Sequence, residues 1–258
     1  MDIDGKDIKP TTFDISFDNV EFSYSGKKIL DDISVKIPQN QMTAIVGPSG
    51  AGKTTFCNLI ARFWDVEKGE ISIGKHNIKE YSLESLMRQI SMVFQNVYLF
   101  QDTIENNIKF AKPDATHEEV IEAAKKACCH EFIMKLPEQY ETVIGEGGAS
   151  LSGGERQRIS IARAMIKNAP IIIFDEATAN VDPENEDKLQ VAMEELTRNK
   201  TVIMIAHRLK TIKNANQILV LANGKINQKG THEELIQAEG IYKNFVEARQ
   251  KAVNWKLS

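Results

Sequence analysis

The stretch Gly47–Thr55 constrains the fold of this chain more than any other, because its sequence GPSGAGKTT matches the phosphate-binding loop pattern G-x-x-x-x-G-K-[ST]. A short apolar run, residues 42–46, precedes it and is typical of a buried strand. Apolar residues then recur at helical spacing, at Phe56, Leu59, Ile60 and Phe63. A strand, a glycine-rich turn and a helix in this order are the context that the pattern requires, so we predict a bound phosphate group.

The residue types in this phosphate loop have a physical reason to be there. Glycines let backbone N–H groups turn inward around phosphate oxygens, and a helix N-terminus adds partial positive charge. We expect Lys53 to reach the β- and γ-phosphates of a nucleotide, and the Thr54 hydroxyl to ligate Mg²⁺. The residues expected to contact the nucleotide here are Gly47, Pro48, Ser49, Gly50, Ala51, Gly52, Lys53, Thr54 and Thr55.

Composition argues against several classes of protein. The 258 residues include 32 Lys and Arg against 36 Asp and Glu, a net charge of −4, whereas a nucleic-acid binder usually has a basic excess. The three cysteines lack metal-ligand spacing and are typical of reduced thiols in a cytosolic compartment. No apolar run is long enough to cross a bilayer, and the polar, acidic start of the chain does not resemble a signal peptide.

The region before the phosphate loop predicts strands and one candidate ligand. Apolar and polar residues alternate over 15–24 and again over 29–37, which favours strands with one buried face. Tyr24 lies at the end of the first of these strands. It is either an edge-strand tyrosine or a ring that stacks on a nucleotide base, and its position favours neither interpretation.

A continuous apolar run over 90–94 ends at Gln95, which either caps a loop or, if it faces the phosphate loop, uses its side-chain carbonyl to ligate Mg²⁺ or to orient a water. Residues from about 103 to 140 are mostly helical by pattern. We therefore expect a helical subdomain inserted in a nucleotide-binding core.

The segment Leu151–Glu155 contains a helix-capping pattern. Ser152 and Glu155 form an S-x-x-E capping box, which by itself explains both residues. It does not explain the pair Gly153 and Gly154, because glycine is unfavourable at a helix start unless a group must approach the backbone closely. An anion is the group that a helix N-terminus favours.

Two further strand ends carry polar side chains. The apolar run 171–174 predicts a central parallel strand, and Asp175 and Glu176 follow it. Since ligands bind outside the carboxyl ends of such strands, we expect Asp175 to hold Mg²⁺ and Glu176 to polarise a water against the γ-phosphate. His207 ends a second buried strand, and is either a satisfied loop residue or a donor to the γ-phosphate.

Taken in order, these segments resemble the nucleotide-binding domain of an ABC transporter, and the stretch SMVFQ ending at Gln95 together with Gly145–Gly147 resembles the exporter branch. The resemblance covers about residues 13–248. It implies an α/β fold: a P-loop NTPase core with a parallel sheet, an antiparallel β subdomain, and a helical subdomain at about 97–165. Residues 1–12 are then a linker or the cut end of a longer protein, and residues 249–258 a C-terminal tail.

The resemblance also implies roles and partners. Tyr24 matches the aromatic residue beside the base, Gln95 the Q-loop and Asp182 the D-loop aspartate. Two such domains, identical or sister chains, enclose ATP and Mg²⁺ head to tail, so that the signature segment Leu151–Glu155 acts on the partner's nucleotide. A transmembrane domain, expected in the same natural chain, would place this domain at the cytoplasmic face of an inner or plasma membrane. The residues implied to act across the dimer are Ser152, Gly153, Gly154 and Glu155.

Departures from the family pattern are modest. Asn180 lies where alanine is common, which leaves its role open, and Glu155 replaces the commoner glutamine. An alternative class is a soluble ABC-type ATPase that acts on nucleic acid or ribosomes. The chain lacks the long coiled coil and the second domain that such proteins carry. A non-hydrolysing nucleotide sensor is disfavoured by Glu176.

Overall fold

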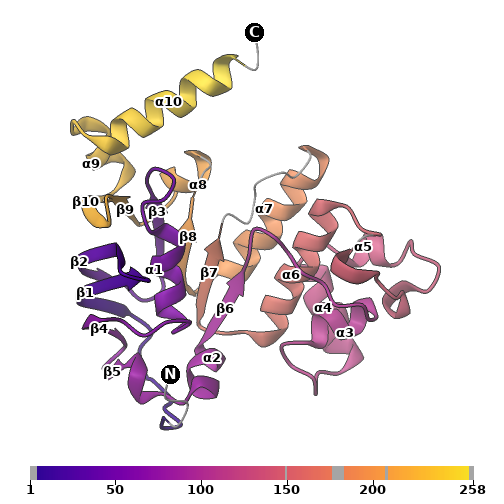
Figure 1. Cartoon of the computed structure of the whole chain (residues 1–258). Helices are drawn as coiled ribbons and strands as arrows, with labels where there is room; N and C mark the ends of the chain where they lie inside the picture. The colour runs from indigo at the N-terminus through magenta and orange to yellow at the C-terminus, as the bar shows by residue number, and fades with distance from the viewer. Residues whose placement is uncertain (1–4, 149, 176–182, 207–208, 256–258) are drawn as a thin grey trace. The chain divides into compact units, whose positions relative to one another are not determined.

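The computed structural model describes residues 5–148, 150–175, 183–206 and 209–255 (Figure 1). The chain divides into two compact units. Unit 1 comprises Met1–Ile90 and Thr201–Ser258, and unit 2 comprises Ser91–Lys200. The predicted helical subdomain, about 97–165, falls within the limits of unit 2.

Unit 1 contains an antiparallel sheet in the order β2-β1-β4-β5. Its first strands are long and alternate buried and exposed residues, as the sequence pattern predicts for a sheet with one buried face. Phe17 of this sheet stacks on Phe56 with ring centroids 4.1 Å apart, so the sheet packs against the helix that follows the phosphate loop. The strands are β1 (Ile15–Tyr24), β2 (Lys27–Ile37), β4 (Lys68–Ile73) and β5 (His76–Asn77).

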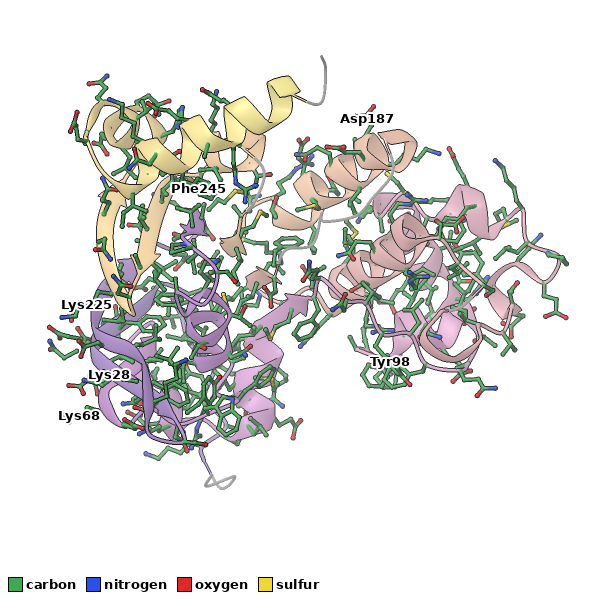
Figure 2. The ribbon with its side chains drawn as sticks, turned by 45° about the horizontal axis from the view of Figure 1, so that its top comes forward. Lys28, Lys68, Tyr98, Asp187, Lys225 and Phe245 are labelled. Carbon is green, nitrogen blue, oxygen red and sulfur yellow. The ribbon has the colours of Figure 1, made fainter. Side chains whose placement is uncertain are left out.

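A row of alternating charges crosses the surface of unit 1. Lys28 bridges Glu21 at 3.0 Å and Asp31 at 2.7 Å, while Lys68 extends the row from Glu21 and Lys225 extends it from Asp31. The three lysines are labelled in Figure 2. Each exposed ion pair contributes little to stability, so this row serves mainly to keep the outer surface of the sheet charged.

The other strands of unit 1 follow the order β10-β9-β3-β8. β3 pairs in parallel with both β8 and β9, whereas β9 and β10 form an antiparallel hairpin. The hairpin turns at Asn223 and Gly224, an Asn-Gly pair that is typical of a type I′ turn, and both residues have positive φ (52° and 74°). The strands are β3 (Met42–Val46), β8 (Thr201–Ile205), β9 (Gln217–Ala222) and β10 (Lys225–Gly230).

Among its described residues, unit 1 has six further elements. They are α1 (Lys53–Ile60), η1 (Ile78–Glu80), α2 (Leu83–Gln89), α8 (Leu209–Lys213), α9 (His232–Gln237) and α10 (Ile241–Trp255). Helix α10 continues past residue 249, the predicted start of a C-terminal tail.

The segment expected as an N-terminal linker is bound to the η1–α2 region over part of its length. The Lys6 N–H donates to the Glu80 carbonyl at 2.7 Å, and the Ser85 hydroxyl donates to the Ile8 carbonyl at 2.7 Å. Residues 6–8 are therefore anchored in the fold of unit 1.

Unit 2 contains two neighbouring strands and most of the helices predicted for the insertion. β7 is buried over its four apolar residues, as expected for a central strand. The elements are β6 (Ile90–Val93), α3 (Ile104–Lys109), α4 (His117–Lys126), α5 (His130–Ile133), η2 (Gln139–Glu141), η3 (Glu146–Gly148), α6 (Gly153–Lys167), β7 (Ile171–Asp175) and α7 (Pro183–Thr197). In the part of the chain that the structure describes, no helix is long and apolar enough to span a membrane.

Candidate nucleotide-binding site

The phosphate loop lies between β3 and α1, the predicted context. Gly47 has φ +150° and its Cα approaches β9 so closely that a Cβ would lie 1.9 Å from the Leu221 carbonyl oxygen. Gly50 and Gly52 also have positive φ, 75° and 97°. The loop therefore needs glycine at Gly47 for close packing and at the other two positions for backbone conformation.

Lys53, at the first position of α1, folds back over this loop. Its side chain is buried, and Nζ donates to the carbonyl oxygens of Gly47 at 3.1 Å and Pro48 at 2.9 Å. These bonds hold the ammonium group against the loop, so its position is fixed by the same backbone that forms the loop.

The outer rim of the loop is accessible. Pro48, Ser49, Gly50 and Thr54 are exposed, whereas Gly47, Ala51, Gly52 and Thr55 are buried. Helix α1 has Gly52 as its N-cap, with no side-chain cap. The N–H groups of its first turn are therefore suited to meet an anion rather than a capping side chain.

In unit 1, the strand before the phosphate loop, β3, is paired with β8, the strand that precedes His207. The β3 and β8 strands run in parallel register, with Ile45 opposite Ile205, and the Ala206 N–H donates to the Ile45 carbonyl at 3.1 Å. Their carboxyl ends therefore lie side by side.

The predicted catalytic residues Glu176 and His207 lie outside the described residues, as do Asn180 and Asp182.

Tyr24 ends β1, next to the turn formed by Ser25 and Gly26. Its side chain is half-buried and makes edge contacts with Phe22, at 4.8 Å, and with Trp64, at 5.3 Å between ring centroids. Trp64 is not among the residues predicted from the sequence. Phe63 is predicted to lie on the helical face of α1, but α1 ends at Ile60 because Arg62 takes a left-handed conformation with φ 52°. Phe63 is consequently 44% exposed.

Unit 2 carries the other predicted side chains. Asp175 is half-buried at the carboxyl end of β7, and Gln95 is exposed just after β6. Gln157 of α6 donates to the Phe94 carbonyl at 3.3 Å. The backbone before Gln95 is thus linked to the helix that follows the signature segment.

The signature segment forms the predicted capping box at the start of α6. The Ser152 side chain accepts from the Glu155 N–H at 3.3 Å, and the Glu155 carboxylate accepts from the Ser152 N–H at 2.8 Å. Ser152 and Gly153 are exposed, while Gly154 is buried. The N-terminus of a fifteen-residue helix, with two glycines in its first turn, is thereby exposed at Ser152 and Gly153.

The loop that leads to this helix is held by Arg156. Its guanidinium donates to the carbonyls of Leu151 at 2.5 Å and Gly148 at 3.4 Å. Gly148 has φ +77°, and a Cβ there would lie 2.6 Å from the Arg156 side chain. The glycine therefore allows the arginine to reach the loop.

Unit 2 also has a groove lined by aromatic side chains, which the sequence analysis does not identify. Tyr98, Phe100 and Phe110 line it and are 55%, 38% and 59% exposed. Arg163 of α6 lies over two of these rings and donates to the carbonyl oxygens of Asn107, at 2.8 Å, and Tyr98, at 3.3 Å. Burial lowers the Arg163 pKa to about 10. Figure 2 labels Tyr98 at this surface.

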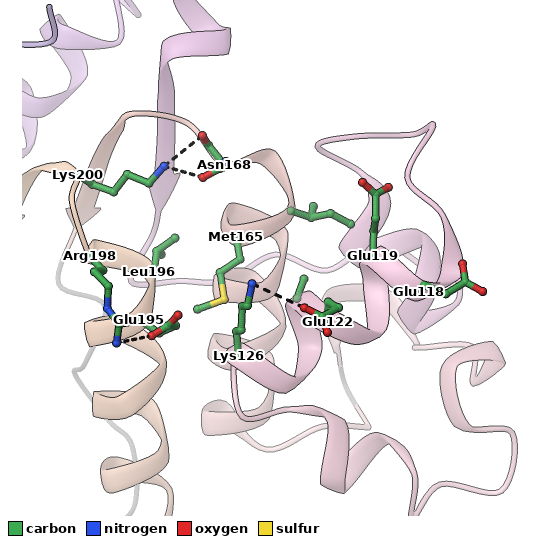
Figure 3. A pocket seen from close by; sticks show the side chains of 12 residues that line it. Glu118, Glu119, Glu122, Lys126, Met165, Asn168, Glu195, Leu196, Arg198 and Lys200 are labelled. Carbon is green, nitrogen blue, oxygen red and sulfur yellow. Dashed lines mark hydrogen bonds and ion pairs between the residues drawn. The ribbon is translucent and has the colours of Figure 1, made fainter.

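A cavity of about 520 Å³ in unit 2 is a different feature (Figure 3). It lies between α4, α6 and the end of α7, and has acidic and basic side chains over the apolar Met165 and Leu196. Lys200 in its wall donates to the Asn168 side chain at 2.6 Å. None of the predicted nucleotide ligands lines this cavity.

The fold and the phosphate loop define a nucleotide-binding α/β protein. A family model described as "ABC transporter" matches residues 30–179. The chain therefore belongs to the ABC transporter family, and it is an ATP-binding, ATP-hydrolysing domain of that family.

Related proteins and structures agree with this assignment. An ATP-dependent lipid A-core flippase of Desulfotalea psychrophila is 51% identical over 235 residues, 91% of this chain. A putative multidrug export ATP-binding/permease protein of Bacillus subtilis is 49% identical over 233 residues, 90% of this chain. The structure of a bacterial Atm1-family ABC exporter with ATP bound superposes with a TM-score of 0.89, at 40% identity over 94% of this chain.

The chain spans only part of these proteins: 41% of the flippase, 40% of the export protein and 42% of the exporter structure. None of these names describes a protein that acts on nucleic acid or ribosomes, so the comparisons give no support to that alternative.

Proposed function

We propose that this ATPase domain powers the export of a substrate across a membrane, through ATP-driven head-to-tail dimerisation with a second ABC ATPase domain. The observation that carries the proposal is the start of α6, where Ser152 and Gly153 are exposed at the N-terminus of a fifteen-residue helix. This end of the helix suits a phosphate group, and the family pattern supplies one on a partner domain.

The phosphate loop binds the triphosphate of ATP in the same chain. Lys53 supplies a fixed positive charge, and the buried Gly47 and Gly52 bring backbone N–H groups close to the phosphates. Tyr24, at the end of β1, stacks on the base.

The donor set suits Mg²⁺, because the Thr54 hydroxyl, the Gln95 carbonyl and the Asp175 carboxylate are all hard oxygen ligands. Thr54 and Gln95 are exposed, and Asp175 is half-buried at a strand end. These three residues would hold the ion, which supplies charge neutralisation at the phosphates.

Two residues that follow strands, Glu176 and His207, carry out hydrolysis. Glu176 accepts a proton from the attacking water, and His207 donates a hydrogen bond to the γ-phosphate and keeps the water in line. Both assignments come from the sequence pattern.

A transmembrane domain docks on the aromatic groove of unit 2. Three exposed aromatic rings and the guanidinium of Arg163 offer an apolar surface with a positive charge at its base. Gln95 lies three residues before Tyr98, so docking here can act directly on the Mg²⁺ ligand. The domain then sits at the cytoplasmic face of an inner or plasma membrane.

Disulfide cross-linking tests the head-to-tail arrangement. Two variants are prepared, Ser49→Cys in the phosphate loop and Ser152→Cys in the signature segment, both at exposed positions. The half-exposed Cys128 is replaced by serine in each, while the buried Cys57 and Cys129 are kept. We expect a covalent dimer when the two variants are mixed with ATP and Mg²⁺ under oxidising conditions.

The controls separate this arrangement from random collision. Lys75→Cys, on the exposed β4–β5 turn, replaces Ser49→Cys in a parallel mixture and is expected to give no ATP-dependent dimer. Cross-linking that is equal with and without ATP, or equal for both mixtures, would contradict the proposal.

A further inference from the structure

Three aromatic rings of unit 1 meet beside the end of β1. The centroid of the Tyr24 ring lies 4.8 Å from that of Phe22 and 5.3 Å from that of Trp64, with interplanar angles of 89° and 82°. Phe22 is buried, whereas Trp64 is 50% exposed. The Tyr24 ring therefore has one neighbour fixed in the core and one neighbour at the surface.

The turn that carries Trp64 is itself fixed. Arg62 is buried, with 3% exposure, and its Nε donates to the Asp65 carboxylate at 2.9 Å. Its guanidinium also reaches the Tyr81 carbonyl at 3.4 Å. The buried guanidinium of Arg62 thus fixes the turn from Arg62 to Asp65, and this turn sets the position of the Trp64 side chain.

The chain after Trp64 is bound to the strand that ends at Tyr24. The Glu67 N–H donates to the Glu21 carbonyl at 3.1 Å, and the Ser23 hydroxyl donates to the Glu67 carboxylate at 3.0 Å. These bonds set Trp64 alongside β1. The contact between the Tyr24 and Trp64 rings therefore follows from how the two backbone segments are joined.

We propose that Trp64 is a positioning residue, which holds the Tyr24 ring in the orientation that stacks on the base of ATP. This inference rests on the proposed role of Tyr24. Tyr24 lies at a strand end next to a turn with two positive φ values, and its ring has edge contacts with Phe22 and Trp64. Because α1 begins at Lys53 and Trp64 follows its end, one short segment places both the phosphate ligand and the support for the base platform.

Nucleotide affinity tests the proposal, with inorganic triphosphate as a probe that has no base. Trp64→Ala is expected to raise the calorimetric Kd for ATP about threefold to tenfold, the range expected for the loss of one aromatic pair. The Kd for triphosphate and kcat at saturating ATP should stay within about twofold of the wild type. Trp64→Phe, which keeps a ring, should restore most of the ATP affinity.

Phe63→Ala is the matched control, since it removes an exposed aromatic side chain from the same turn. It is expected to bind ATP like the wild type. If Trp64→Ala binds ATP normally, or loses affinity for triphosphate to the same extent, Trp64 does not position the base platform and the proposal is wrong.

A double-mutant cycle separates this proposal from the role of Tyr24. If Trp64 acts through Tyr24, Trp64→Ala has no further effect on the ATP affinity of Tyr24→Ala. If the two substitutions lower the ATP affinity additively, Trp64 does not act through Tyr24. The positioning role is then wrong, while the role of Tyr24 stands. If Tyr24→Ala binds ATP like the wild type, the base platform itself is wrong and the positioning role falls with it.

Discussion

The ammonium group of Lys53 lies 2.9 Å from the carbonyl oxygen of Pro48, five residues earlier in the same phosphate loop. A second bond, to the Gly47 carbonyl at 3.1 Å, also holds this group. The fold of the loop therefore fixes the position of the positive charge that we propose for binding the triphosphate.

Removing this charge should abolish tight nucleotide binding. We expect Lys53→Ala to weaken ATP binding more than tenfold, since hydrogen bonds to charged groups are worth about 1.5–3 kcal/mol. Isothermal calorimetry measures the Kd. Lys27→Ala, which removes an exposed lysine from the start of β2, is the matched control and should bind normally. An unchanged affinity in Lys53→Ala would contradict the role of the phosphate loop.

Gly47→Ala should be poorly tolerated, because its new Cβ would lie 1.9 Å from a backbone oxygen of β9. Gly26→Ala, in the β1–β2 turn, also changes a glycine with positive φ but meets no atom within 4 Å. We expect Gly26→Ala to cost about 1 kcal/mol of unfolding free energy, and Gly47→Ala at least about 2 kcal/mol more. Urea unfolding checks this difference, and equal losses would show that close packing is not the reason for the glycine.

The signature serine has two roles that a matched pair of variants can separate. Ser152 and Thr116 both form capping boxes, at α6 and α4. Each change to alanine should lower the unfolding free energy by about 1 kcal/mol. We expect ATP turnover to fall only in Ser152→Ala, because Thr116 caps a helix with no proposed ligand. Equal turnover in the two variants would leave Ser152 with the capping role alone.

Local signals in the sequence predict much of this fold. The glycine pattern of the phosphate loop, the Asn223-Gly224 turn and the capping box at Ser152 each depend on neighbours within a few residues, and the structure has all three. The contact of Tyr24 with Trp64 joins residues forty positions apart, so no local pattern signals it. Arg62 ends α1 in a left-handed conformation that its residue type does not favour, which is why Phe63 is wrongly placed on the helix.

The helical part of unit 2 should respond to acid through Glu105. Burial tends to raise the pKa of this carboxyl, but hydrogen bonds from Lys109 at 2.6 Å and His117 at 2.5 Å outweigh it and hold the pKa below its usual value. A lowered pKa in the folded state stabilises the fold above the unfolded-state pKa of about 4.3, and this contribution is lost as the pH falls through the folded-state value.

We therefore expect the difference in unfolding free energy between the wild type and Glu105→Gln to be largest near neutral pH and to shrink below about pH 4. Urea unfolding at several pH values measures it. Glu84→Gln, which breaks an exposed ion pair with Arg88, should change stability by less than about 0.5 kcal/mol throughout. A difference for Glu105→Gln that does not vary with pH would contradict the ionic role.

The central claim is that this domain closes on a second copy around ATP and reopens when ATP is hydrolysed. Glu176→Gln keeps the size of the side chain but removes the proton acceptor, so bound ATP should persist. The direct measurement is the molar mass of this variant by size-exclusion chromatography with light scattering, with and without ATP and Mg²⁺, beside its rate of phosphate release. We predict a dimer that forms only with ATP, and no turnover. A monomer under all conditions, with turnover equal to that of the wild type, would contradict the account.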